Sequence, residues 1–419
     1  MKTILIRNGL IITQDDDRRI LKGDMLIEGK RISKIGKVKG SADIEIDACG
    51  NAVLPGFINT HAHVAMAHLK GLLDDIPLET FLERTFSLDS NRSEKGIYNA
   101  SMLGMAEMID CGITSFHDLY YSEDIIAKAA SKLGIRAFLA WVTLDEEYTT
   151  QKGSPLKNAE SFIRKKHGDL VTPSVGIQGI YVASDETYNG ASDIARKYDT
   201  TMHTHLSETR KEVYDYAAGH NGQRPVEHLS SIGFLDSHLI AAHSAFVTMR
   251  EVRQLAKANV KVSWNSISNC KLGTGGMPPV PEMLDHGITI SLGTDSNGSN
   301  NSLNMFEMMK FSSLLVKSAR WNPAVINAQK ILDMATRDAA SSLRRNDIGV
   351  LKEGNLADII MIDLNQSNLI PANEDNIVQG IVYSANPSNV DTVIVNGSIL
   401  KSRKKLKRKI TETQKENMV

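Results

Sequence analysis

The sequence predicts an α/β fold: a (β/α)8 TIM-type barrel joined to a small composite β-sandwich domain that is formed from both termini. Two observations lead to this prediction. In the middle of the chain, eight short apolar or β-branched runs alternate with longer amphipathic stretches, which is the pattern of a parallel barrel. Near both ends, short strand-like runs separated by turn signals replace this alternation, so strands from the two ends are expected to pair.

The eight barrel strands are expected in the central part of the chain. In order, the runs are VLPGFINTH, GITSFHD, RAFLAWVT, PSVGIQGIYV, TTMHTHL, LIAAH, VKVSWN and ITISLGTD. Helical patterns such as EKGIYNASMLGMAEMIDC and SEDIIAKAASKLG lie between several of them. The domains predicted from this division are residues 55–349 for the barrel and residues 1–54 with 350–400 for the sandwich.

Composition narrows the class of protein. The chain has 419 residues, 42% of them hydrophobic, and a net charge of −1, so it can bury a large core and indicates neither a nucleic-acid nor a membrane partner. No apolar run approaches the roughly 20 residues of a membrane span, and the N-terminus lacks the features of a signal peptide. The three cysteines are odd in number and have no C-x-x-C spacing, which fits the reducing cytoplasm.

The last nineteen residues, 401–419, differ in composition from the rest. Their first part, KSRKKLKRK, has seven basic residues in nine. Such a run is typical of a solvated tail, either frayed or helical, and a weak contact with a polyanion is the alternative.

Side chains that can bind metal stand at the ends of several predicted strands. The first run ends in His61 and His63, and the fifth, sixth and eighth runs end in His205, His243 and Asp295. Barrel enzymes place catalytic groups at the carboxyl ends of their strands, so these side chains are expected to converge on one face. Neutral imidazoles and a carboxylate suit zinc or iron(II) with an open position for water.

Three further residues near strand ends are candidates for the site. HTHLSET contains a second His-x-His, so His203 competes with His205 as a metal ligand. Glu208 follows just past the same strand end, where a carboxylate can reach a substrate as a general acid or base; a loop salt bridge is the alternative. His117 ends the second run and is either part of the pocket wall or an ordinary buried residue.

The sequence resembles the amidohydrolase superfamily, and within it the branch of methylthioadenosine/S-adenosylhomocysteine deaminases and triazine chlorohydrolases. The matching segments span most of the chain and include LPGFINTHAH, GITSFHDLY, HTHLSET, NSISNCKLGTGGMPPVPEML, SLGTDSNGSNNSLNMFEMMK and GVLKEGNLADIIMIDL. The resemblance implies one divalent metal per chain, zinc or alternatively iron. It implies the metal ligands His61, His63, His205 and Asp295, and the catalytic residues Glu208, His243 and Asp295. His203 is then interpreted as a neighbour of His205 on the same face of the strand, where it supports the ligands without binding the metal.

The same resemblance implies a metal-dependent hydrolytic deaminase that converts an adenine nucleoside into the inosine analogue and ammonia. Methylthioadenosine, 5′-deoxyadenosine, adenosine and S-adenosylhomocysteine are the candidate small-molecule substrates. A chlorohydrolase or deaminase of a triazine or another aminated heterocycle is the alternative, because the same machinery serves both. A non-catalytic scaffold of this fold would predict an incomplete ligand set, which the sequence does not have. A homo-oligomer is compatible with the sequence.

Substrate contacts are expected at Asp89, Gln178 and Ser299, in addition to Glu208 and His243. Asp89 aligns with a glutamate that related deaminases use for the ribose hydroxyls, and a helix N-cap is the alternative. Gln178 replaces a histidine that is common at the end of the fourth run, and the lack of a lysine in that run agrees with a single metal. Ser299, in TDSNGSNN, is expected to line the base pocket, with turn formation as the alternative.

The third run predicts a preference among the nucleosides. Relatives that accept S-adenosylhomocysteine are expected to hold its carboxylate with an arginine near the end of this run, where the present sequence has Trp141. Because an indole cannot neutralise a carboxylate, Trp141 is expected to bind substrate by packing on an apolar 5′ substituent or on the base. Small and uncharged 5′ groups are therefore expected to be preferred. Ordinary packing of Trp141, with another arginine such as Arg164 in its place, is the alternative.

Overall fold

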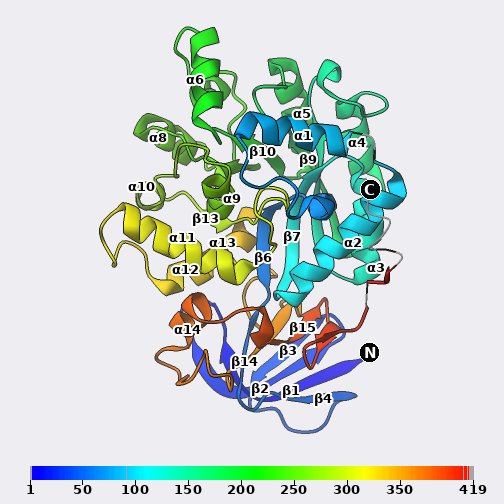
Figure 1. Cartoon of the computed structure of the whole chain (residues 1–419). Helices are drawn as coiled ribbons and strands as arrows, with labels where there is room; N and C mark the ends of the chain where they lie inside the picture. Colours follow the sequence, from blue (N-terminus) through cyan, green and yellow to red (C-terminus); the bar gives the residue numbers. More distant parts are fainter. Residues whose placement is uncertain (1, 91, 409, 413, 415–419) are drawn as a thin grey trace.

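The computed structural model describes residues 2–90, 92–408, 410–412 and 414, and it has a two-part architecture (Figure 1). Eight parallel strands form a nearly closed barrel in which the strand order follows the chain. A nine-stranded sheet, built from both ends of the chain, lies at one end of this barrel. The fold class predicted from the sequence is confirmed.

The barrel strands are almost entirely buried, as parallel strands covered by helices must be. They are β6 (Phe57–Ala62), β7 (Ile113–Tyr120), β8 (Arg136–Thr143), β9 (Val171–Ile177), β10 (Met202–Leu206), β11 (Leu239–His243), β12 (Lys261–Trp264) and β13 (Ile290–Leu292). Among the described residues, the backbone pairing that joins β6 to the segment after β13 is an isolated parallel bridge between Ala62 and Asp295. There the backbone N–H of Asp295 donates to the carbonyl of His61 at 2.9 Å, so residues predicted to bind metal lie at the seam of the barrel.

Helices follow the strands and surround the barrel. They are α2 (Glu94–Asp110), α3 (Glu123–Leu133), α4 (Pro155–Arg164), α5 (Asp185–Tyr198), α6 (Arg210–Gly219), α7 (Pro225–Ser231), α8 (Met249–Lys257), α9 (Ser266–Lys271), α10 (Val280–Asp285), α11 (Met305–Ala319), α12 (Ala328–Met334) and α13 (Arg337–Ser342). Between β6 and α2 the chain also forms the 3-10 segment η1 (Val64–Leu69) and helix α1 (Leu78–Asp89), and η2 (Glu146–Tyr148) follows β8. In Figure 1, α1 lies across the end of the barrel near β9 and β10.

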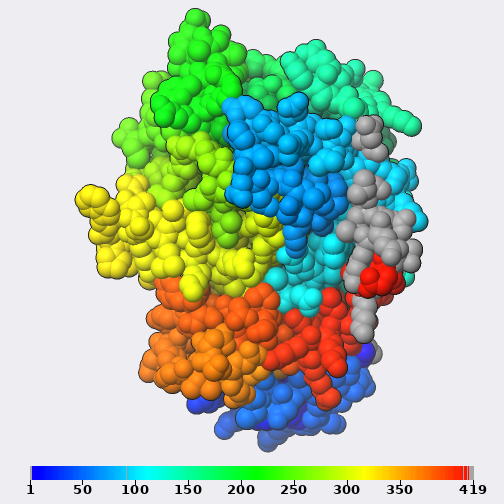
Figure 2. Space-filling view, in the orientation of Figure 1, coloured from blue at the N-terminus to red at the C-terminus, as the bar shows by residue number. Residues whose placement is uncertain are grey.

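The terminal sheet joins the two ends of the chain. Its strands are β1 (Thr3–Ile12), β2 (Ile20–Glu28), β3 (Arg31–Gly36), β4 (Ile44–Asp47), β5 (Asn51–Pro55), β14 (Ile359–Asp363), β15 (Val390–Val395), β16 (Ser398–Ser402) and β17 (Lys405–Leu406), with α14 (Ile377–Tyr383) and η3 (Pro387–Asn389) beside them. β5 pairs with β14 in antiparallel register, Val53 opposite Met361. Figure 2 shows the N-terminal and C-terminal segments together at one end of the molecule.

Side chains of the terminal sheet alternate between two cores, as strand geometry requires. Val53 packs with Ile4 and Ile6 in a core that belongs to the terminal sheet. Its neighbours Ala52 and Leu54 belong instead to the main core that runs into the barrel. The sheet therefore serves both as a separate layer and as a base for the barrel.

A buried ion pair links the terminal sheet to the barrel. Arg136, at the start of β8, donates to the two carboxylate oxygens of Asp358 at 2.7 and 3.1 Å, and the two side chains are only 1% and 2% exposed. Asp358 also accepts the backbone N–H of Asn396 at 2.7 Å. Because both charges have left water, each depends on the other for compensation.

The basic C-terminal segment begins inside the sheet rather than in solvent. Lys401 lies on β16, is buried, and donates from Nζ to the carbonyl of Asp110 at 2.9 Å. The hairpin of β16 and β17 extends to Leu406, so the solvated tail expected from residue 401 differs from the structure over residues 401–406. Residues 409, 413 and 415–419 of that expected tail lie outside the described residues.

Within the described part of the chain, no helix combines the length and the apolar character needed to cross a membrane. The thiols of Cys49, Cys111 and Cys270 are free.

Candidate active site

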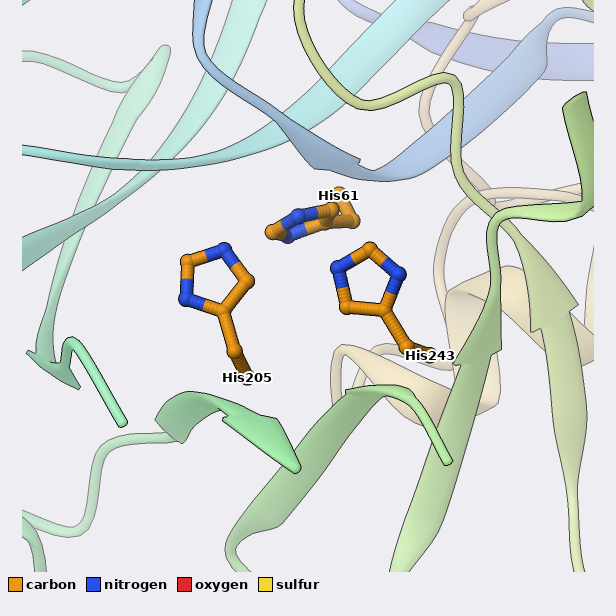
Figure 3. A group of neighbouring side chains, drawn as sticks. All are labelled: His61, His205 and His243. Carbon is orange, nitrogen blue, oxygen red and sulfur yellow. The ribbon is translucent and has the colours of Figure 1, made fainter. Parts of the chain in front are cut away.

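The predicted metal-binding side chains meet at the carboxyl ends of the barrel strands. Figure 3 shows His61, His205 and His243 reaching from β6, β10 and β11 with their rings around a common space. His61, His63 and Asp295 form a second, overlapping group, and in each group the nearest ring nitrogens and carboxylate oxygens lie within 4.8 Å of one another. All of these side chains are buried.

The contacts within this group fit a bound cation. Nε2 of His63 lies 3.3 Å from Nε2 of His205 and 3.4 Å from Oδ1 of Asp295, and Nε2 of His61 lies 3.7 Å from the same oxygen. Nε2 of His61 is buried and has no hydrogen-bond partner, which is costly unless another group satisfies it. Three imidazoles and one carboxylate are a ligand set that divalent transition metals accept, so His61, His63, His205 and Asp295 could hold a metal ion.

Hydrogen-bond partners on the side away from the proposed metal position determine which ring nitrogen of each imidazole faces that position. Nδ1 of His63 donates to the carbonyl of Leu119, and Nδ1 of His205 donates to the carbonyl of Gln178, both at 2.6 Å. Since a carbonyl can only accept, these protons stay on Nδ1 and the Nε2 lone pairs point into the site. His61 differs, because its Nδ1 lies 2.9 Å from Nε2 of another imidazole, His203.

Asp295 is held by donors on both carboxylate oxygens. Ser268 Oγ donates to Oδ2 at 2.6 Å, and the backbone N–H of Ser296 donates to Oδ1 at 2.7 Å. Burial alone would raise the pKa of Asp295, but the neighbouring His63 and His243 and the Ser268 hydrogen bond keep that pKa below its usual value. The backbone of Asp295 has a φ of 65°, in the left-handed region that aspartate adopts more readily than most residues.

His243, at the end of β11, presents a donor to the same space. Its Nδ1 accepts hydrogen bonds from the side-chain amides of Asn269 at 3.0 Å and Asn265 at 3.3 Å. This leaves the proton on Nε2, which lies 3.7 Å from Glu208 Oε1 and 4.0 Å from Asp295 Oδ2. Neither these amides nor the Ser268 hydroxyl was identified as functional from the sequence, although all three lie in the segment NSISNCKL that carries the family resemblance.

Glu208 lies just past β10, in a short segment whose backbone is held by hydrogen bonds at the start of α6. A capping box joins Thr209 and Glu212 at the start of α6, and the Glu212 carboxylate also accepts the backbone N–H groups of Ser207 and Glu208 at 3.0 and 2.8 Å. Burial, followed by the charge of Asp295, raises the pKa of Glu208 to about 8. A carboxyl that keeps its proton near neutral pH can act as an acid.

A cavity of about 1230 Å³ opens above this group and is lined by residues from several barrel loops and α1. Glu208, Asp89, Gln178 and Ser299 all line it, as do His63, His205, His243 and Asp295. Lys211 is the only lysine or arginine among the described residues that form the lining. Its ammonium is already paired with Asp215.

The predicted substrate contacts differ in how they are held. The Asp89 carboxylate accepts from the Tyr120 hydroxyl and lies 3.2 Å from Nη1 of Arg92. Asp89 is the last residue of α1, and the N-cap of the next helix is Ser93, so the N-cap alternative does not apply. Ser299 Oγ lies 3.0 Å from Ser296 Oγ in the same loop. Ser299 therefore contributes to the loop structure and also lines the cavity.

The structure does not bring Trp141 to the cavity. Its indole donates to Gln151 Oε1 at 2.9 Å and packs on Phe162, with 5.6 Å between the ring centroids. The next residue, Val142, lines the cavity instead, because successive residues of a strand face opposite sides. Arg164 is also absent from the lining, so neither the indole nor the proposed replacement arginine reaches the site.

The comparisons with known proteins agree with this fold. The chain matches the Amidohydrolase family model over residues 52–400. It is 37% identical over 402 residues to a 5-methylthioadenosine/S-adenosylhomocysteine deaminase of Pyrococcus furiosus, covering 95% of this chain and 94% of that protein. It is 38% identical over 386 residues to a 5′-deoxyadenosine deaminase of Methanocaldococcus jannaschii, covering 90% of each.

Solved structures show the same fold. An adenosine deaminase from Xanthomonas campestris with bound zinc superposes with a TM-score of 0.93 at 24% identity and covers 99% of this chain and 96% of its own. An atrazine chlorohydrolase from Arthrobacter aurescens TC1 complexed with zinc gives 0.92 at 25% identity, with 99% and 100% covered. The His/Asp group is consistent with a metal site, and both of these neighbours contain bound zinc. From the family match and the two relatives that span nearly its whole length, the chain belongs to the amidohydrolase family.

Proposed function

We propose that this protein is a metal-dependent hydrolytic deaminase that converts an adenine nucleoside and water into the inosine analogue and ammonia. One observation carries the proposal: a partly buried acid, Glu208, and an imidazole donor, His243, lie 3.7 Å apart beside the His/Asp group in one cavity. Amide-type hydrolysis at a ring carbon needs a proton donor, a proton acceptor and an activated water. The relatives named as adenine-nucleoside deaminases support the substrate class.

The metal assignment rests on the donor set. We infer that His61, His63, His205 and Asp295 hold one divalent metal, zinc or alternatively iron. The unpartnered buried nitrogen of His61 and the zinc-bound structural neighbours support this assignment. At such a site, the chemistry supplied when the metal is bound is activation of water for attack on carbon.

The protein side chains then move the protons. Asp295, steadied by Ser268 and Ser296, takes the proton of the attacking water. His243 donates a hydrogen bond from Nε2 to the attacking oxygen, because its Nδ1 is already an acceptor. Glu208 gives its proton to the ring nitrogen beside the attacked carbon, which makes that carbon more electrophilic. The proton held by Asp295 then passes to the leaving amine and ammonia departs. As the ring C=O forms, the hydroxyl proton left on the attacked carbon returns to the Glu208 carboxylate, which restores the acid.

The remaining contacts are assigned to the nucleoside. Asp89, Gln178 and Ser299 line the cavity that contains the acid and the donor, which supports their roles in holding the ribose and the base. Gln178 has a second role that the sequence did not suggest, since its backbone carbonyl orients His205.

The proposed setting is cytoplasmic, with no nucleic-acid partner. The three free thiols and the near-neutral net charge support this setting. A homo-oligomer remains compatible with it.

The direct test is ammonia release by the zinc-loaded protein. The panel is methylthioadenosine, 5′-deoxyadenosine, adenosine and S-adenosylhomocysteine, with pterins and aminated or chlorinated triazines as comparators. Turnover of the nucleosides above the comparators is the expected result. Hydrolysis of triazines alone would favour the alternative, and no hydrolysis of any compound would reject an enzyme of this kind.

Among the nucleosides, we expect methylthioadenosine to be preferred over S-adenosylhomocysteine. The only described lysine or arginine in the lining, Lys211, is paired with Asp215, so the described lining offers no free lysine or arginine to the amino-acid carboxylate. A charge-assisted hydrogen bond is worth about 1.5–3 kcal/mol, so its lack should lower kcat/KM by about ten- to a hundredfold. Side-by-side kinetics measure this ratio.

The control for this preference is Lys211→Met. If Lys211 leaves Asp215 to bind the carboxylate, the substitution will lower kcat/KM for S-adenosylhomocysteine and leave methylthioadenosine unchanged. Equal kcat/KM values for the two nucleosides in the unchanged protein would contradict the preference.

A further inference from the structure

A chain of three histidines runs from the proposed metal site into the core of the barrel. Nδ1 of His61 lies 2.9 Å from Nε2 of His203, and Nδ1 of His203 lies 2.9 Å from Nδ1 of His117. Nε2 of His117 then lies 3.2 Å from Ser174 Oγ. The four residues come from β6, β10, β7 and β9, so this row of hydrogen-bonded side chains crosses the inside of the barrel.

The inner members of this chain cannot contact a substrate. His203, His117 and Ser174 are fully buried, and none of them lines the cavity. The pocket-wall role considered for His117 is therefore replaced by a place in the core. The hydrogen bonds that connect these residues to the site pass through His61.

His61 is oriented differently from the other proposed ligand imidazoles. His63 and His205 are each held by a backbone carbonyl, which can only accept a hydrogen bond and so fixes the proton on Nδ1. The partner of His61 is another imidazole, which can either accept or donate. The position of the proton on His61 therefore depends on the direction in which hydrogen bonds are donated along the three histidines.

His61 can bind metal only when the hydrogen bonds along the three histidines are donated in one of the two possible directions. A neutral imidazole has one donor and one acceptor nitrogen. If Nδ1 of His61 donates to Nε2 of His203, then His203 donates from Nδ1 to His117, and His117 donates from Nε2 to Ser174. In the opposite direction, Nδ1 of His61 accepts, its proton moves to Nε2, and the lone pair that faces Asp295 is blocked.

We propose that His203 and His117 are positioning residues that select the metal-binding tautomer of His61 and thereby set the affinity of the site for its metal. The proposal rests on the metal site assigned above. It adds that two side chains with no access to the metal or the substrate control the metal affinity, through hydrogen bonds that reach across the barrel.

The first test measures zinc affinity by chelator competition. In His203→Leu the acceptor for His61 is lost, and zinc binding should weaken about 10- to 100-fold, as for other groups that orient ligand histidines. His203→Gln places an amide oxygen near the position of Nε2 and should recover most of this loss. His117→Leu touches no ligand, yet it should weaken zinc binding about fivefold, the worth of one hydrogen bond.

A matched core variant separates positioning from packing. Phe138→Leu changes a buried ring that contacts His117 edge-on, with 6.4 Å between the ring centroids, and leaves the histidine chain intact. It should lower the free energy of unfolding of the metal-free protein without changing zinc affinity. If His203→Leu and His117→Leu behave in the same way as this control, the positioning role is overturned.

A second readout observes the tautomers directly. In the zinc-loaded protein with 15N-labelled histidine, NMR should show the proton on Nδ1 of His61 and His203 and on Nε2 of His117. Protons on the opposite nitrogens of His203 and His117 would overturn the proposal. Zinc binding by the unchanged protein tests the metal site itself, so failure of that site is distinguished from failure of the histidine chain.

Discussion

Replacing Glu208 with glutamine is expected to lower kcat for nucleoside deamination about a hundred- to ten-thousandfold, the usual contribution of a general acid or base. The amide keeps the shape of the side chain but has no acidic proton to give to the substrate ring. Zinc content should stay near that of the unchanged protein, because Glu208 is not one of the proposed ligands. Steady-state kinetics and metal analysis on the same preparation measure both quantities.

Glu212→Gln is the matched control for this substitution. Glu212 is the neighbouring carboxyl, is partly buried, and accepts hydrogen bonds from backbone N–H groups before α6. Its substitution should lower the free energy of unfolding more than kcat. If Glu208→Gln lost its metal together with its activity, or if both variants lost kcat equally, Glu208 would have a structural role instead.

The largest expected effect on stability comes from Asp358→Ala. This change leaves the guanidinium of Arg136 buried, 1% exposed, without its carboxylate. Removing one partner of a buried ion pair costs about 3–5 kcal/mol, and the N–H of Asn396 loses its acceptor as well. Urea denaturation of the metal-loaded protein measures the change in the free energy of unfolding.

A surface ion pair in the terminal sheet provides the comparison. Lys22 and Glu374 lie 3.4 Å apart, and their side chains are 79% and 51% exposed. Glu374→Ala should change the free energy of unfolding by less than about 1 kcal/mol. Similar losses in Asp358→Ala and Glu374→Ala would show that the buried pair does not hold the barrel and the terminal sheet together.

The fold and the central group of the site could be predicted because the sequence marks strand ends. An apolar run that ends in histidine or aspartate shows both the strand and the side of the barrel that its last residue reaches. His61, His205 and Asp295 follow this rule, and the structure brings them together. The alternation of runs and helical stretches identified the barrel in the same way.

Contacts between distant side chains could not be predicted in this way. The amide of Asn269 and the hydroxyl of Ser268 act on His243 and Asp295 from another strand end, and an uncharged polar residue after a strand is also an ordinary loop residue. It is equally hard to predict from the sequence on which face of a strand a single side chain lies. At Trp141 an alignment displaced by one position exchanges the outward indole for the inward Val142, because the side-chain period of a strand is two.

The pairing of β5 with β14 determines when the protein can finish folding. During synthesis, Asn51–Pro55 leaves the ribosome long before its partner Ile359–Asp363, and the whole barrel is made in between. Until the partner arrives, that edge of the sheet has unpaired backbone groups, which are a template for pairing with other chains. Contacts between such distant segments form late, so a nascent chain that stalls before Ile359 is the form of this protein most exposed to aggregation.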